Sequence, residues 1–248
     1  MIHTFEFNNK KLLDIGAVLM EKPHYPMSAK ELDFTAVPGK SRDIITDKNR
    51  FKNSSISYKV SSYPLFCSYT EQEFVYILSE WLLTSYDYKI LRDTYNKGYF
   101  RKAICTSISD PTVEADGMVW TTVTFNCDPF LYNDAGLQTV TYSNLLSTPA
   151  YLTNLEQWES EPIIKVSGNG MFTVTISGNS FTITLESSDG EITIDKPNEN
   201  VYDSGGNNCN DKINAKKLPY LKAGQNKISV IGTGDNFTLK IIPNWRRL

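Results

Sequence analysis

The chain has 248 residues, which suits one large domain or two small ones, and either could bury a sizeable core. Charged residues make up 21% of it and the net charge is −3, so no basic excess favours sequence-independent binding of nucleic acid. The N-terminus lacks the basic and apolar segments of a secretory signal, and no stretch approaches the roughly 20 apolar residues of a membrane span. We therefore expect a protein that folds in a cytoplasm and has no direct contact with a membrane.

The first half mixes strands with one helix. Alternating apolar and polar residues predict half-buried strands at Thr4–Phe7, Ser55–Val60, Lys102–Ile108 and Val119–Cys127. Residues 21–54 show no such alternation. They contain the turn dipeptide Pro38-Gly39, so we expect irregular structure there. A second loop is expected at Asp110–Gly117.

The clearest local element is a helix from about residue 71 to 84. Thr70 is a good N-cap, and Glu73, three residues later, completes a capping box. Apolar residues then follow at helical spacing on one face: Phe74, Ile77, Leu78, Trp81 and Leu82. We expect the helix to lie on a sheet with Trp81 pointing inward, and a Trp81→Ala change to cost about 3–5 kcal/mol if the ring is buried.

The character of the chain changes around Asp128-Pro129. Residues 129–161 contain two prolines, many small polar residues and only weak periodicity. They predict a connector that crosses between two domains, with room for one or two strands.

The second half reads as an all-β domain. Short β-branched or aromatic runs predict strands at Ile163–Val166, Met171–Ile176, Phe181–Leu185, Glu191–Asp195, Lys227–Ile231 and Phe237–Ile242. Turn sequences separate them, notably Gly168-Asn169-Gly170, Gly178-Asn179, Asp189-Gly190 and Gly232–Asp235. No amphipathic helix is evident, so we expect an antiparallel sandwich of roughly 100 residues.

A catalytic or metal site is not evident. His3 and His24 are the only histidines, and neither is accompanied by a nucleophile-elbow motif. The four cysteines, Cys67, Cys105, Cys127 and Cys209, have wide, irregular spacings, which favours reduced structural thiols over zinc ligands.

Other motifs that carry chemistry are also missing. The chain has no phosphate-binding or dinucleotide-binding glycine motif, and paired carboxylates for glycosidic hydrolysis cannot be located from sequence. The loop Asp203–Asp211 resembles a cation loop in composition but lacks its ordered acidic positions. We expect no catalytic, cofactor-binding or metal-ligating residues.

Three groups of motifs resemble the distal tail protein family of siphovirus-type phages. The first is Phe5–Asn9 followed by Asp14–Gly16, and the second is Val123–Tyr132, with its F-x-C-x-P-F-x-Y pattern. The third is the C-terminal series Leu218–Leu221, Ala223–Ile228 and Ile241–Leu248, which ends in P-x-W-R. The motifs occur in family order over nearly the whole chain.

The resemblance implies a structural virion protein rather than an enzyme. It implies an N-terminal α+β belt domain, residues 1–133, that forms a hexameric ring, and a galectin-like β-sandwich with its connector, residues 134–248. Partners would be other copies of the chain, the major tail-tube protein and a hub or fibre protein, with a receptor-binding protein or host saccharide on the outer domain. No cofactor and no specific nucleic acid are implied. The location would be the phage tail tip, after assembly in the host cytoplasm.

Two other functions remain to be weighed. A carbohydrate-binding module could stack sugars on Trp158, Tyr202, Tyr220 or Trp245, although packing is the more common role of such residues. A cell-wall hydrolase lacks its catalytic residues in this sequence. For ring contacts, the loops Pro38–Asn49 and Asp110–Gly117 are candidates, because closed rings use heterologous contacts between edges and loops.

Overall fold

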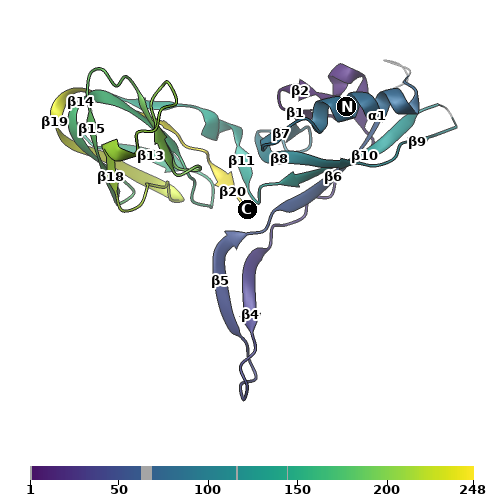
Figure 1. Ribbon diagram of the computed structural model, residues 1–248, viewed down its shortest axis with the longest axis horizontal. Coiled ribbons are helices and arrows are strands. Elements are labelled where there is room, and N and C mark those ends of the chain that lie inside the picture. The colour runs from purple at the N-terminus through teal and green to yellow at the C-terminus, as the bar shows by residue number, and fades with distance from the viewer. Residues whose placement is uncertain (1, 63–68, 116, 144) are drawn as a thin grey trace. The chain divides into compact units, whose positions relative to one another are not determined.

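The computed structural model describes residues 2–62, 69–115, 117–143 and 145–248 (Figure 1). It contains two compact units, Met1–Leu131 with Leu248, and Tyr132–Arg247. Strands predominate in both, and the first also contains the α-helix α1 (Glu71–Leu82). The expected fold class, an α+β first part followed by an antiparallel β-sandwich, is confirmed.

The first unit is built on an antiparallel sheet with the strand order β2-β1-β7-β8-β10-β6-β3. At one end of this order, Asn8 and Asn9 both have positive φ, as expected for a tight hairpin turn between β1 and β2. The strand β9 pairs with β10, so part of the loop expected at 110–117 is a hairpin instead. The strands are β1 (Phe5–Phe7), β2 (Lys10–Lys11), β3 (Ala17–Leu19), β6 (Ser54–Ser62), β7 (Lys89–Asp93), β8 (Tyr99–Ile108), β9 (Thr112–Val113) and β10 (Val119–Cys127).

Helix α1 covers one face of this sheet, as its apolar stripe predicts. Phe74, Leu78 and Leu82 are fully buried, and the capping box at Thr70 and Glu73 is formed. The sheet face that packs against the helix includes alternate residues of β10, from Val119 to Cys127, in the predicted pattern. A 3-10 helix, η1 (Leu12–Ile15), adds to the same core. Within the described ranges, no helix is long and apolar enough to span a bilayer.

The expectation of irregular structure at residues 21–54 is wrong for two stretches of that segment. Strands β4 (Lys30–Thr35) and β5 (Ile44–Phe51) pair as a separate two-stranded hairpin (Figure 1). Nearly all residues of both strands are exposed or half-buried, so neither face contributes to a core in the single chain. The pairing therefore depends on backbone hydrogen bonds and cross-strand contacts. Because neither face is buried, the apolar alternation that marks half-buried strands is weak in the sequence.

The second unit is a sandwich made from one long bent ribbon. Strands β14 (Ile163–Ile176) and β19 (Gly224–Ile242) pair along almost their whole lengths. Their halves take different neighbours, which gives two layers, β12-β19-β14-β16-β17 and β13-β19-β14-β15-β18. The other strands are β12 (Val140–Tyr142), β13 (Ala150–Asn154), β15 (Asn179–Leu185), β16 (Ile192–Asp195), β17 (Asn200–Tyr202) and β18 (Ile213–Ala215). Residues from both halves of the ribbon belong to a single apolar core.

The ribbon changes the interpretation of two predicted turns. Gly168-Asn169-Gly170 and Gly232–Asp235 do not end strands but lie opposite each other where β14 and β19 bend. The strands approach so closely here that a Cβ on Gly234 would lie 2.2 Å from the backbone oxygen of Asn169. Glycine at these positions therefore permits a close contact inside a strand, which the sequence pattern cannot distinguish from a hairpin turn.

The connector expected at 129–161 is largely part of the second unit. It contains β11 (Leu131–Asn133), the 3-10 helix η2 (Asp134–Leu137), β12 and β13. Strand β11 pairs with β20 (Arg246–Arg247), and β12 and β13 both pair with β19. The remaining 3-10 helix, η3 (Asn210–Lys212), precedes β18. Weak periodicity here reflects short edge strands, which bury few side chains.

Candidate functional site

The β4–β5 hairpin has two chemically different faces. In its register Phe34 lies opposite Ile45. Leu32, opposite Asp47, shares their face because side chains alternate along a strand. An ion pair between Lys30 and Asp47 borders this apolar cluster. Phe34 and Ile45 are each 61% exposed. Large apolar side chains paired in solvent are typical of a surface that is covered in an assembly.

The opposite face of the hairpin carries an ion-pair ladder. Lys48 Nζ lies 3.0 Å from Asp33 Oδ2, and Arg50 Nε lies 3.0 Å from Glu31 Oε2. The hydrogen bond from Lys48 to Asp33 raises the pKa of Lys48 above its ordinary value. Exposed ion pairs contribute only about 0–1 kcal/mol each, and a two-stranded hairpin alone is marginally stable in water. The ladder therefore adds little stability and does not provide a core.

The base of the hairpin is attached to the rest of its unit. The backbone N–H of Lys52 donates to the carbonyl of Ala29 at 2.8 Å. The rings of Phe51 and Phe130 meet edge to face with centroids 6.0 Å apart, and Ser28 Oγ donates to the carbonyl of Pro129 at 3.0 Å. These contacts hold the start of β4 and the end of β5, so the base of the hairpin is fixed in position.

The sequence contained a signal for this surface that the prediction missed. Glu31-Leu32-Asp33-Phe34 alternates charged and apolar residues, and Pro38-Gly39 follows it as a turn. The candidate contact loop Pro38–Asn49 contains the hairpin tip and most of β5. The alternation spans only four residues, which is too short a pattern to distinguish a strand from a loop.

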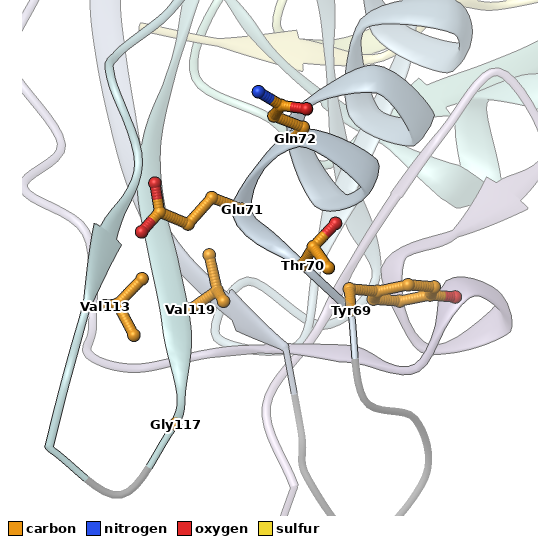
Figure 2. A pocket seen from close by; sticks show the side chains of 7 residues that line it. All are labelled: Tyr69, Thr70, Glu71, Gln72, Val113, Gly117 and Val119. Atoms are coloured by element: carbon orange, nitrogen blue, oxygen red, sulfur yellow. The ribbon is translucent and has the colours of Figure 1, made fainter.

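A hollow of about 410 Å³ lies between the start of α1 and the β9–β10 hairpin (Figure 2). The helix N-terminus beside it already has an acceptor, because Thr70 Oγ1 accepts from Glu73 N–H at 3.3 Å. Glu71 and Glu73 place negative charge in the first turn, which opposes an anionic ligand. The hollow therefore does not suit a phosphate or carboxylate ligand. Its lining residues are Tyr69, Thr70, Glu71, Gln72, Val113, Gly117 and Val119.

The histidines are far from forming a catalytic set. His3 stacks on Tyr95 with ring centroids 4.2 Å apart, and its Nδ1 lies 3.2 Å from Thr94 Oγ1. His24 is exposed. Among the described residues, no group of three or more His, Cys, Asp and Glu side chains could hold a metal ion.

The cysteines of the described ranges are free and buried. Burial raises the pKa of Cys105 to about 11 and that of Cys127 to about 12, so both thiols stay protonated near neutral pH. Cys209 is also buried in the second unit, while Cys67 lies outside the described residues. Protonated, buried thiols are poor nucleophiles and poor metal ligands.

The aromatic residues considered for sugar stacking have different environments. Trp245 is 8% exposed and belongs to the core of the second unit, which removes it as a sugar platform. Trp158 and Tyr202 are half-buried, and Tyr220 has lysine ammonium groups over its ring. In the loop Asp203–Asp211, the Asp203 carboxylate accepts hydrogen bonds from Gly205 and Asn207 N–H groups, so it serves the turn.

One chain thus combines a helix-covered antiparallel sheet, an extra hairpin and a β-sandwich. Over 100% of both chains, the structure is similar to the crystal structure of the SPP1 Dit protein, described as a paradigm of the hub adsorption apparatus in phages that infect Gram-positive bacteria. The TM-score is 0.71 at 13% sequence identity. No protein-family model and no curated protein matches the chain. The resemblance seen in the sequence motifs is thus confirmed at the level of the fold.

Proposed function

We propose that this chain is a structural protein of a phage virion, located at the tail tip, whose copies form a hexameric ring. The ring joins the tail tube to a hub or fibre protein. Residues 1–133 form the ring, and residues 134–248 form the outer sandwich. The chain is assembled in the host cytoplasm and acts as a scaffold without catalysing a reaction.

The observation that carries this proposal is the uncovered apolar face of the β4–β5 hairpin. Phe34 and Ile45 lie side by side in solvent on strands that have no core of their own. In the proposed ring the hairpin of one copy packs on a different surface of the next, which is a heterologous contact, and such contacts form a ring when the rotation between copies closes. The likeness to the SPP1 Dit fold supports the same assignment.

The experiment compares assembly of the purified full-length chain with that of two lysine variants. Native mass spectrometry and negative-stain images of the wild type should show a closed ring of several subunits, alone or with the tail-tube protein. Phe34→Lys combined with Ile45→Lys should abolish the ring, since two charges would have to be buried in the contact. The melting temperature of the separated subunit should change little, because neither side chain is in its core.

Ile44→Lys is the matched control. Ile44 is 53% exposed and neighbours Ile45, but it points to the opposite face of the hairpin. The same type of substitution there should leave the ring intact. A wild-type chain that stays monomeric even with the tube protein, or a double variant that assembles like the wild type, would contradict the proposal.

A further inference from the structure

The positive charge of the second unit is concentrated in one short segment. Residues 132–247 contain ten Lys and Arg residues and 12 Asp and Glu residues. Five of those ten cations lie within residues 212–227, a stretch that contains no Asp or Glu. A chain with a net negative charge therefore has one strongly basic surface segment.

Most of these lysines have no carboxylate partner. Lys212 forms an ion pair with Asp189. The other four, Lys216, Lys217, Lys222 and Lys227, are exposed, and none forms an ion pair within the described part of the chain. The pKa of Glu199 is lowered mainly by its hydrogen bond and ion pair with Lys196, and to a smaller extent by the charge of Lys217. We call these four residues the lysine patch.

The centre of the patch is fixed. The ammonium groups of Lys217 and Lys222 lie 5.0 and 6.0 Å from the ring centroid of Tyr220, so one ring brings the two cations together. Leu221 beside it is fully buried. The buried side chain of Asn226 accepts from Lys222 N–H at 2.8 Å and donates to the Lys222 carbonyl at 2.9 Å. The backbone of Lys222 is therefore held in place next to Tyr220.

Lys217 and Lys222 repel each other around the Tyr220 ring, and a bound anion would relieve this repulsion. The patch consists of lysine alone, and lysine is a compact point charge without the planar fork that arginine offers to a single carboxylate or phosphate. Protein interfaces are depleted in lysine and enriched in arginine. An acidic protein surface is thus a poor match, whereas a flexible polymer with regularly repeated negative charge suits several point charges spread along one segment.

We propose that the lysine patch binds a phosphodiester-linked polymer of the host cell wall. This inference rests on the proposed function, because a tail-tip protein meets the cell surface. Binding would be electrostatic, with each lysine displacing one condensed counterion from the polymer, and therefore strongly dependent on salt. The patch would give the virion a reversible hold on the wall.

The test measures retention of the full-length chain on immobilised poly(glycerol phosphate) at increasing salt. Wild type should bind at about 50 mM salt and lose most of its affinity by about 300 mM. Lys217→Glu combined with Lys222→Glu should weaken binding at least about tenfold, and the corresponding double arginine variant should restore it. Lys22→Glu with Lys97→Glu, which makes the same charge change at exposed lysines of the first unit, should stay within about twofold.

Double-stranded DNA with matched phosphate content and neutral dextran serve as comparison polymers. No retention of wild type, equal loss in the control variant, or DNA binding as tight as that of poly(glycerol phosphate) would overturn the inference. Ring formation is recorded in the same samples. Rings without retention would contradict the lysine patch alone, whereas retention by single subunits would support the patch and count against the ring.

Discussion

The hydroxyl of Tyr58 donates a 2.9 Å hydrogen bond to Asp93 Oδ2 in the first unit. Tyr25, from the segment before the hairpin, donates to the same oxygen at 2.9 Å. The other carboxylate oxygen, Oδ1, accepts from the backbone N–H groups of Tyr95 and Asn96. One acidic side chain thereby links strand β6, strand β7 and the chain that leads into β4.

Replacing Asp93 should be more damaging than replacing either tyrosine. Asp93→Ala leaves the hydroxyls of Tyr25 and Tyr58 and two backbone N–H groups without their acceptor, and each unsatisfied donor that is buried costs about 1–3 kcal/mol. Tyr58→Phe removes a single hydrogen bond, worth about 1 kcal/mol. Urea unfolding followed by tryptophan fluorescence measures both, and equal costs for the two variants would show that the carboxylate does not organise this cluster.

Stability should fall steeply in alkali. Burial and the Asp93 carboxylate raise the pKa of Tyr58 well above 10.0, and burial raises the pKa of Cys127 from 9.0 to about 12. The unfolded chain therefore releases these protons at lower pH than the folded chain. Their contribution is complete below about pH 9 and is lost as pH rises through the folded pKa values, by up to about 1.4 kcal/mol per pH unit and group. Unfolding free energies measured between pH 8 and 11 should show this decline.

The Cys127→Ala variant tests the origin of that decline. It should be less stable at pH 8, because it opens a small space in the core, but its stability should fall less steeply between pH 9 and 11. The same slope as in the wild type would assign the alkaline loss to other groups.

The sequence-based cost for Trp81→Ala needs correction, because the ring is only half-buried. Its Nε1–H donates to the carbonyl of Phe7 at 3.1 Å, and the ring stacks on Phe5 with centroids 5.6 Å apart. We expect Trp81→Ala to cost about 2–3 kcal/mol and Leu78→Ala, at a fully buried position, about 3–4 kcal/mol. Thermal and urea unfolding of the two variants provide the comparison, and the reverse order would contradict the packing of α1.

Gly234→Ala should severely destabilise the second unit. The added Cβ would lie 2.2 Å from Asn169 O and 2.7 Å from the ring of Phe172. The paired strand backbone cannot move away without disrupting its hydrogen bonds. We expect a loss of about 3 kcal/mol or more from this overlap. Thr233→Ala, at the exposed neighbouring position, should change stability by less than about 0.5 kcal/mol. Similar melting temperatures for both variants would show that the ribbon does not pack this closely.

Local chemistry was sufficient for several elements. The capping box at Thr70 and Glu73 and the apolar stripe behind it predicted α1, because a helix is stabilised by contacts within a few residues. The alternation in Val119–Cys127 predicted which side chains face the core. The three ordered groups of motifs, at the start, middle and end of the chain, predicted the fold that the structural comparison confirmed.

Only the tertiary structure decided the features that join distant residues. Ile163 pairs with Ile242, and the ribbon they begin bends at glycines that look like turns in the sequence. The β4–β5 hairpin buries neither face in the single chain, so burial left no alternating pattern long enough to recognise. The sequence shows the four lysines close together along the chain. Their lack of ion pairs, and the positions of Lys217 and Lys222 around Tyr220, follow from the folded structure. Periodicity reports which side chains avoid water within one element, whereas pairing, bending and charge clustering depend on which elements meet.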